Sequence, residues 1–181
     1  QLGALDPESD YTGNAIDRIY LNAGILTGNT AWPRLNVPYE MRTGMFRLEA
    51  NLNIAAGVVM YFEEDAALWV AQQGSLTALG TASDPIIFTA TEAIPGYWMG
   101  IEFAFSNNVN NQLDHIVLDY AGGTYGNGQG ALVLYGESSL VCSLKLTNST
   151  IRNSNEFGLW IDNGTIFEGA NNYFSNNALG D

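Results

Sequence analysis

The chain has 181 residues, of which 46% are hydrophobic, and 19 acidic residues against six basic ones give a formal net charge of −13. So few basic residues exclude a face that binds nucleic acid, and they disfavour docking on anionic lipid, because both partners require clustered lysine and arginine. No apolar run approaches the roughly 18 residues of a membrane-spanning helix, so we expect no membrane insertion.

Short apolar runs bounded by Gly, Asn, Asp or Pro dominate the chain, and sustained helical periodicity is missing. Residues 1–50 are irregular, and we expect them to form an N-terminal segment with a cap over the first coil. From residue 51 onward the runs are typical of short β-strands. In chain order we predict strands at 58–62, 67–70, 76–79, 86–89, 98–103, 113–120, 131–135, 140–146, 158–161, 165–167 and 172–174.

Many short strands fit either a sandwich or barrel, or a β-solenoid. A recurring apolar–x–apolar triplet favours the solenoid: it occurs as IIF at 86–88, IVL at 116–118 and LKL at 144–146, in steps of 30 and 28 residues. Asn-rich corners point the same way, because stacked Asn side chains can hydrogen-bond along a solenoid axis. Hairpin turns are scarce, with only Asn127-Gly128 and Asn163-Gly164 qualifying.

Four consecutive motifs carry a resemblance to a known family. They are G-x-x-[VM]-x-F at 57–62, G-x-L-x-A-x-G-T at 74–81, P-I-x-F-T at 85–89 and G-x-W-x-G-I at 96–101. The chain resembles, over about residues 31–181, the pectin-lyase-like right-handed parallel β-helix domains of bacterial secreted and cell-surface proteins. The resemblance implies an all-β solenoid with its coils in residues 51–181, and an extracellular or cell-surface location.

The C-terminal end is expected to be uncapped. After residues 172–174 the next strand of the solenoid does not follow, and an uncapped solenoid exposes apolar core and strand edges. We therefore expect the chain to be part of a longer protein, or this end to meet another protein domain or a glycan.

Carboxylates are the candidate catalytic groups, since glycoside hydrolysis needs two of them at a set separation. His115, the only histidine, is expected to share an outward face with Asp119 about 13 Å away, too far for a direct acid–base pair. The candidates on predicted strands are Glu102, Asp114, Asp119 and Asp162. Basic partners are scarce, which counts against a lyase and makes catalysis the second choice.

Other residues suggest weaker possibilities. The acidic triplet Glu63-Glu64-Asp65 could bind Ca²⁺ or be a solvated turn; no calcium-loop motif occurs, and we expect no cofactor. Cys142 lies in an apolar run and is expected in the core.

Several aromatic residues could stack on sugar rings if exposed, or pack in the core and corners. Trp98 lies within a fold motif and is interpreted as structural. This aromatic set is Trp69, Tyr97, Trp98, Tyr125, Tyr135 and Trp160.

These observations predict a non-catalytic structural or adhesive module. The alternative on the same fold is a carbohydrate-active enzyme or carbohydrate-binding module. A third class, an assembly module, would bury the uncapped end against a partner chain.

Overall fold

The computed structural model describes residues 5–123 and 126–180, and within these ranges the chain forms 19 β-strands. No helix in the same ranges is long and apolar enough to cross a membrane. Every pair of neighbouring strands is parallel, and the strands form three sheets of seven, six and six members. The fold is all-β, as the sequence predicted.

The three sheets are named here by the order in which the chain enters them. Sheet A contains β1 (Ile19–Leu21), β4 (Tyr39–Met41), β7 (Val59–Phe62), β10 (Ile86–Ala90), β13 (Ile116–Asp119), β16 (Thr150–Arg152) and β19 (Tyr173–Ser175). Sheet B contains β2 (Gly24–Leu26), β5 (Gly44–Leu48), β8 (Ala66–Val70), β11 (Gly100–Ala104), β14 (Gly130–Tyr135) and β17 (Phe157–Ile161). Sheet C contains β3 (Thr30–Trp32), β6 (Asn51–Ile54), β9 (Ser75–Leu79), β12 (Gln112–Asp114), β15 (Cys142–Thr147) and β18 (Thr165–Ala170).

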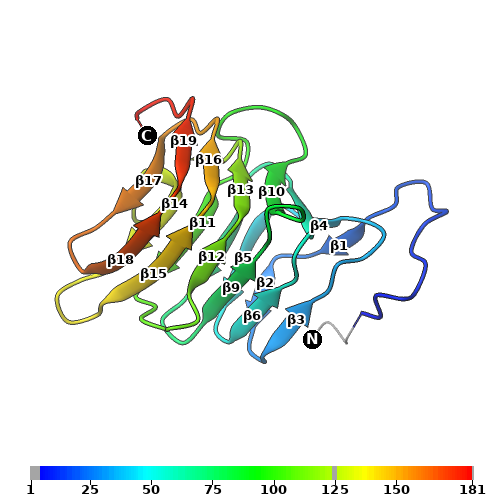
Figure 1. Ribbon diagram of the computed structural model, residues 1–181, viewed down its shortest axis with the longest axis horizontal. Helices are drawn as coiled ribbons and strands as arrows, with labels where there is room; N and C mark the ends of the chain where they lie inside the picture. The colour runs from blue at the N-terminus through cyan, green and yellow to red at the C-terminus, as the bar shows by residue number, and fades with distance from the viewer. Residues whose placement is uncertain (1–4, 124–125, 181) are drawn as a thin grey trace.

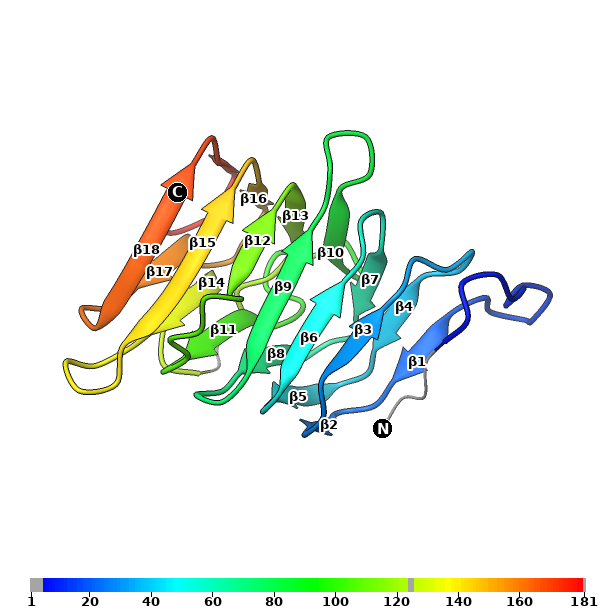
Figure 2. The same ribbon diagram turned by 60° about the horizontal axis from the view of Figure 1, so that its bottom comes forward.

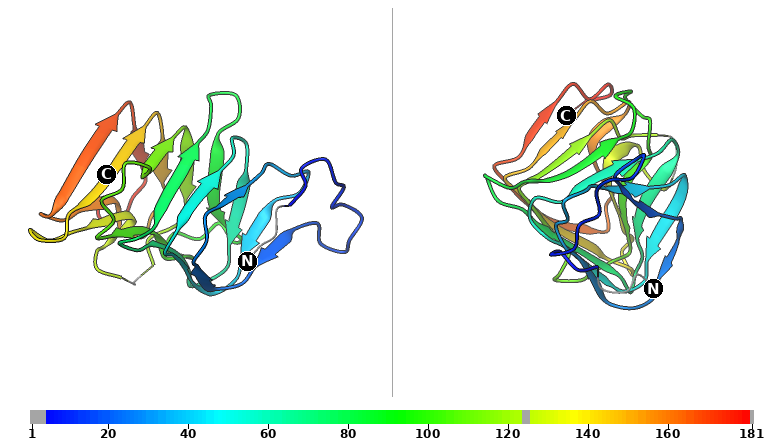
Figure 3. Two further views of the ribbon diagram at one scale, coloured as in Figure 1. Left: turned by 90° about the horizontal axis from the view of Figure 1, so that it is seen from below. Right: turned by 90° about the vertical axis from the view of Figure 1, so that its right-hand side faces the viewer.

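Each strand pairs with the strand three places along the chain, so the chain visits sheets A, B and C in turn and then begins the next coil. Figures 1 and 2 show the coils stacked along the long axis of the molecule, with the first coil and the last at opposite ends. Seen along that axis, in the right panel of Figure 3, the coils surround a common interior. This is a parallel β-solenoid; its right-handed winding and its N-terminal cap stay predictions.

The interior is filled by ladders of equivalent residues from successive coils. In sheet A, Met60, Phe88, Leu118 and Ile151 are aligned by the strand register, and each is fully buried. Parallel pairing places equivalent residues about 4.8 Å apart, so one apolar position per coil produces a continuous stripe. No coil could bury its apolar face without its neighbours.

Asn residues shape the corners, as their recurrence in the sequence indicated. His115, Asn148 and Asn171 occupy the corner between sheets C and A, all with left-handed backbones (φ 47°, 50° and 56°). Asn and His adopt this conformation more readily than most residues. The Nδ2 of Asn171 donates to Oδ1 of Asn148 at 3.2 Å, and the same contact at 3.3 Å joins Asn176 to Asn153 at the next corner.

Three strand predictions need correction. Residues 113–120 are not one strand, because the corner at His115 divides them into β12 of sheet C and β13 of sheet A. The triplet at 144–146 lies in β15 of sheet C, so it is not the equivalent of the triplet at 116–118. Strands also begin at Ile19, well before residue 51; β1 to β4 have only three residues each and therefore do not stand out as apolar runs in the sequence.

The last coil is open at its outer side. Among the described residues, β18 and β19 each have a partner strand on one side only. The outer side of β17 is paired only at its start, where Phe157 bridges Gly180 and the N–H of Gly158 donates a 3.0 Å hydrogen bond to the Gly180 carbonyl oxygen. Ile161 is aligned with the buried Leu134 and therefore points inward, yet it is 44% exposed. Phe167 and Phe174, aligned with buried residues of the preceding coil, are only partly buried.

Candidate functional site

The four candidate carboxylates lie at different places around the solenoid. Glu102 is in the middle of β11 on sheet B, and Asp114 is the last residue of β12 on sheet C. Asp119 ends β13 on sheet A, and Asp162 follows β17 at a corner. The fold therefore distributes these residues over three sheets instead of gathering them in one groove.

Glu102 lies beneath residues 126 and 127, in the short segment that precedes β14. Its side chain is aligned with Trp69 and Val133 on the outer face of sheet B, and the residue is 7% exposed. The two carboxylate oxygens accept hydrogen bonds from Asn127, at 2.5 Å from Nδ2 and 3.2 Å from the backbone N–H. Burial raises the pKa of Glu102, and the Asn127 hydrogen bonds partly oppose that rise.

The connecting segment can approach Glu102 only because a glycine faces it. A Cβ on Gly126 would lie 1.9 Å from Oε2 of Glu102, and the φ of +87° at Gly126 also favours glycine. The carboxylate thereby fixes the segment to the sheet, which is a structural use of its hydrogen-bonding capacity.

Asp114 and His115 form a local pair at the corner between sheets C and A. The Nδ1 of His115 lies 2.9 Å from Oδ2 of Asp114, while Oδ1 accepts hydrogen bonds from Thr147 at 2.6 Å and Asn148 at 2.8 Å. The hydrogen bonds to Thr147, Asn148 and His115 outweigh the desolvation of Asp114 and lower its pKa. The expectation that His115 shares a strand face with Asp119 is wrong, because the corner separates the two residues.

Asp119 is 5% exposed and is held by the next coil. Its Oδ2 lies 2.9 Å from both Nε and Nη2 of Arg152, and its Oδ1 accepts a 2.8 Å hydrogen bond from Asn153. A carboxylate with this many donors serves to join two coils.

Asp162 lies beside Tyr135 of the preceding coil. Relative to Glu102, it is two coils further along the stack and two positions further along the strand direction, so the backbones of the two acids are about 12 Å apart. Its Oδ1 accepts a 2.8 Å hydrogen bond from the N–H of Asn163. The carboxylate of Glu137 lies close to the Tyr135 hydroxyl, at 3.4 Å.

The acidic triplet lies at the corner between β7 and β8. Glu63 forms a 2.8 Å ion pair with Nε of Arg42 and accepts a 3.0 Å hydrogen bond from the N–H of Thr43. Asp65 has a left-handed backbone (φ 59°). Across residues 5–123 and 126–180, no three His, Cys, Asp or Glu side chains converge in a way that could hold a metal ion.

The aromatic candidates are also dispersed. Trp98 is fully buried, and Cys142 is likewise in the core. Trp69 and Trp160 are partly buried on the outer face of sheet B, and Tyr135 contacts Phe105 edge-on at 5.1 Å between ring centroids. Tyr125 lies outside the described residues.

A wide groove crosses the outer face of sheet A at its N-terminal end, with a volume of about 630 Å³. We call it the sheet A groove, and it combines arginine, glutamate and tyrosine side chains from the first four coils. Its lining residues are Ile16, Arg18, Tyr20, Glu40, Arg42, Thr43, Glu63, Glu64, Thr91 and Tyr97.

This groove was not predicted from the sequence, although two signals of it were present. Four of the six basic residues fall between positions 18 and 47. In addition, Tyr20, Glu40 and Tyr61 are separated by one coil each, at intervals of 20 and 21 residues, and the strand register aligns them in one row. Both signals become interpretable only when the coil length near the N-terminus is known.

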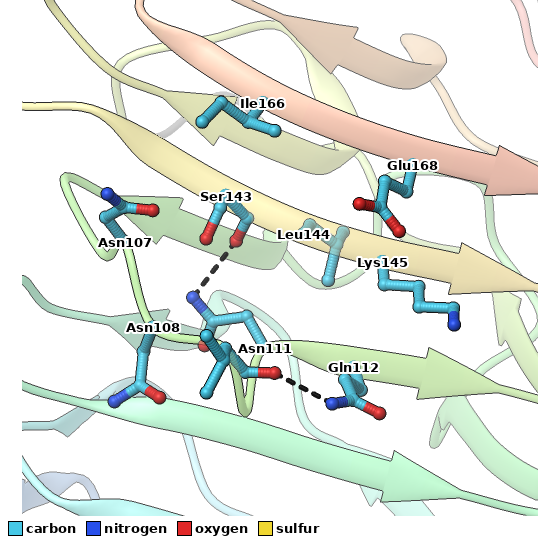
Figure 4. Close-up of a pocket in the computed structure, with 10 residues that line it drawn as sticks. Asn107, Asn108, Asn111, Gln112, Ser143, Leu144, Lys145, Ile166 and Glu168 are labelled. Atoms are coloured by element: carbon cyan, nitrogen blue, oxygen red, sulfur yellow. Dashed lines mark hydrogen bonds between the residues drawn. The ribbon is translucent and has the colours of Figure 1, made fainter.

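A smaller hollow of about 300 Å³ lies on the outer face of sheet C (Figure 4). The buried Asn111 anchors the segment beside it, donating 3.0 Å hydrogen bonds to the carbonyl oxygens of Ser106 and Ser143. Val109 is 85% exposed and Ile166 55% exposed at its rim. Lys145 is aligned with Glu168 in the neighbouring strand, but the two side chains form no ion pair.

No protein-family model matches this chain. Comparison with curated proteins found no match either, and neither did comparison with solved structures.

Proposed function

We propose that this chain is a non-catalytic structural or adhesive module of a bacterial extracellular or cell-surface protein, built as a right-handed, pectin-lyase-like β-helix. The sequence motifs at 57–62, 74–81, 85–89 and 96–101 support the family, the winding and the location. The roles of the candidate carboxylates support the absence of catalysis, because Glu102, Asp114 and Asp119 each serve to hold a loop or a neighbouring coil.

The open last coil is the observation that carries the proposal. Strand edges with unpaired N–H and C=O groups are templates for a further strand, and solenoids require covered ends for solubility. The inward-pointing Ile161, Phe167 and Phe174 add partly exposed apolar surface to those edges. A further β-coil, from another domain or another molecule, would complete both the hydrogen bonds and the core.

Sedimentation velocity over a range of protein concentrations tests this role. The isolated chain should associate as its concentration rises, and Ile161→Glu should reduce the association because it places a charge on the open end. Ile25→Glu is the matched control, since Ile25 is 60% exposed on the same sheet at the opposite end of the stack. A wild-type chain that stays monomeric, or equal effects of the two variants, would contradict the proposal.

The second candidate is a carbohydrate-active enzyme with Glu102 as its acid, favoured by the raised pKa of Glu102 and by the adjacent Trp69. Release of new reducing ends from neutral and acidic polysaccharides, measured with and without Ca²⁺, decides between the two. Release that Glu102→Gln abolishes would replace the structural module with an enzyme. No release across the panel would retain the module.

A further inference from the structure

We propose that the sheet A groove binds an uncharged saccharide. This inference rests on the adhesive part of the proposed function and is independent of the open last coil. It assigns the adhesive contact to the outer face of sheet A over the first four coils, near β1, β4 and β7 in Figure 2.

The groove is built from two similar units, each with an arginine, a tyrosine and a glutamate. In the first unit, Arg18 pairs with Glu40 and lies over the ring of Tyr61, with Cζ 4.5 Å from the ring centroid. In the second, Arg42 pairs with Glu63 at 2.8 Å and lies 5.2 Å from the ring centroid of Tyr20. All of these side chains except Tyr61 line the groove, so it presents guanidinium and carboxylate groups from both units and the ring of Tyr20.

These side chains are held in place before any ligand arrives. Glu40 is 5% exposed, so its position is determined by packing as well as by Arg18. Glu63 accepts hydrogen bonds from both the N–H and the hydroxyl of Thr43, at 3.0 and 3.3 Å. A site ordered in advance loses less conformational entropy on binding, which raises affinity.

The charges of the groove favour a neutral ligand. Two guanidinium groups face three carboxylates in its lining, and the whole chain has a net charge of −13. A polyanion would meet these carboxylates and the net negative field, while a cation would meet Arg18 and Arg42. Hydroxyl groups both donate and accept, so a polyhydroxylated ligand can use both kinds of partner.

The size and the apolar surfaces also suit a saccharide. A volume of about 630 Å³ lies within the roughly 300–1,000 Å³ typical of ligand sites. Tyr20 is 40% exposed and Tyr97 is partly buried in the lining, so ring surface is available beside the polar groups. An aromatic body with a polar tip suits sugars, which have apolar faces and polar edges.

Isothermal titration calorimetry with neutral oligosaccharides (cello-, xylo-, manno- and malto-hexaose) and with acidic hexagalacturonate tests the inference on the full chain. We expect at least one neutral oligomer to bind more tightly than the acidic one. Tyr20→Ala and Arg42→Ala should each weaken that binding about 5- to 30-fold. Both side chains are substantially exposed, so the variants should fold, which circular dichroism will verify.

Arg47→Ala is the matched control. Like Arg42, Arg47 is a half-exposed arginine in an exposed ion pair, here 2.9 Å from Glu49, but it lies on sheet B. Its substitution should change the affinity less than twofold. Three results would overturn the assignment: no binding of any neutral oligomer, tighter binding of the acidic one, or loss of binding in Arg47→Ala with retention in the groove variants. Each would leave the self-association test of the open coil unaffected.

Discussion

Trp98 connects three successive coils, so its removal should destabilise the solenoid more than removal of any surface aromatic. The side chain is fully buried between β10 and β11, and its ring stacks on Phe62 of β7 at 3.8 Å between centroids and 11° between planes. Its Nε1–H donates a 2.9 Å hydrogen bond to the carbonyl oxygen of Asp119 in β13. Trp98→Ala removes all of these contacts together.

The expected loss in free energy of unfolding is about 3–5 kcal/mol, as for other buried tryptophans replaced by alanine. For a chain of this length, about 3–5 kcal/mol corresponds to a fall in Tm of about 6–20 °C. Trp98→Phe should lose less, because the stacking on Phe62 is retained. It still leaves the Asp119 carbonyl without its donor, a cost of about 1–3 kcal/mol.

Urea unfolding followed by far-UV circular dichroism measures these differences without relying on tryptophan fluorescence. Trp160→Ala is the matched control, since it deletes the same side chain from a partly buried position on the outer face of sheet B. A loss for Trp98→Ala below about 1 kcal/mol, or equal to that for Trp160→Ala, would refute the linking role assigned to Trp98.

Three further predictions concern the coil contacts and two buried titratable groups. Gly136→Ala should cost about 1–3 kcal/mol, because a Cβ there would lie 2.1 Å from the carbonyl oxygen of Gly164 in the next coil; an unchanged urea midpoint would contradict this close stacking. Burial raises the pKa of Glu102 above its ordinary value of 4.5, so the folded state binds this proton more tightly than the unfolded state does. The contribution of Glu102 to the free energy of unfolding is therefore present below its pKa in the unfolded state and is lost as pH rises through its pKa in the folded state. Glu102→Gln should flatten this part of the curve of stability against pH. Parallel curves for the wild type and the variant would contradict the prediction. Burial raises the pKa of Cys142 to about 12, so a thiol reagent at pH 8 should label it only in denaturant, and rapid labelling of folded protein would disprove its burial.

Much of the local structure followed from the sequence. The runs at 58–62, 86–89 and 131–135 correspond closely to β7, β10 and β14, because an apolar run between Gly, Asn and Asp residues has few alternatives to a buried strand. The triplets at 86–88 and 116–118 are indeed aligned in neighbouring coils. The next step of that repeat was misassigned, because β13 pairs with Thr150–Arg152 and the triplet at 144–146 belongs to a different sheet.

The functional surfaces were less accessible to sequence reasoning. Glu102 was recognised as a strand carboxylate, but its contact with Asn127, 25 positions away, depends on the tertiary structure. Arg18 and Arg42 are 24 positions apart and belong to different coils, so only the register of β1, β4 and β7 brings them into one groove with Tyr20 and their glutamate partners. Side chains that point outward leave no apolar pattern by which a sequence could place them.

The sequence by itself determined that this chain forms short β-strands around a shared apolar interior, since that follows from strand-length apolar runs and from corner residues that tolerate left-handed backbones. Only the tertiary structure decided which strands are neighbours and which outward side chains meet. Parallel pairing joins residues as close as 20 positions (Ile19 and Tyr39) and as far as 35 (Thr77 and Gln112), because the corners accept loops of different length. The backbone hydrogen bonds that align the coils do not depend on which side chains are present. The number of residues in each coil is therefore not encoded in any local sequence pattern.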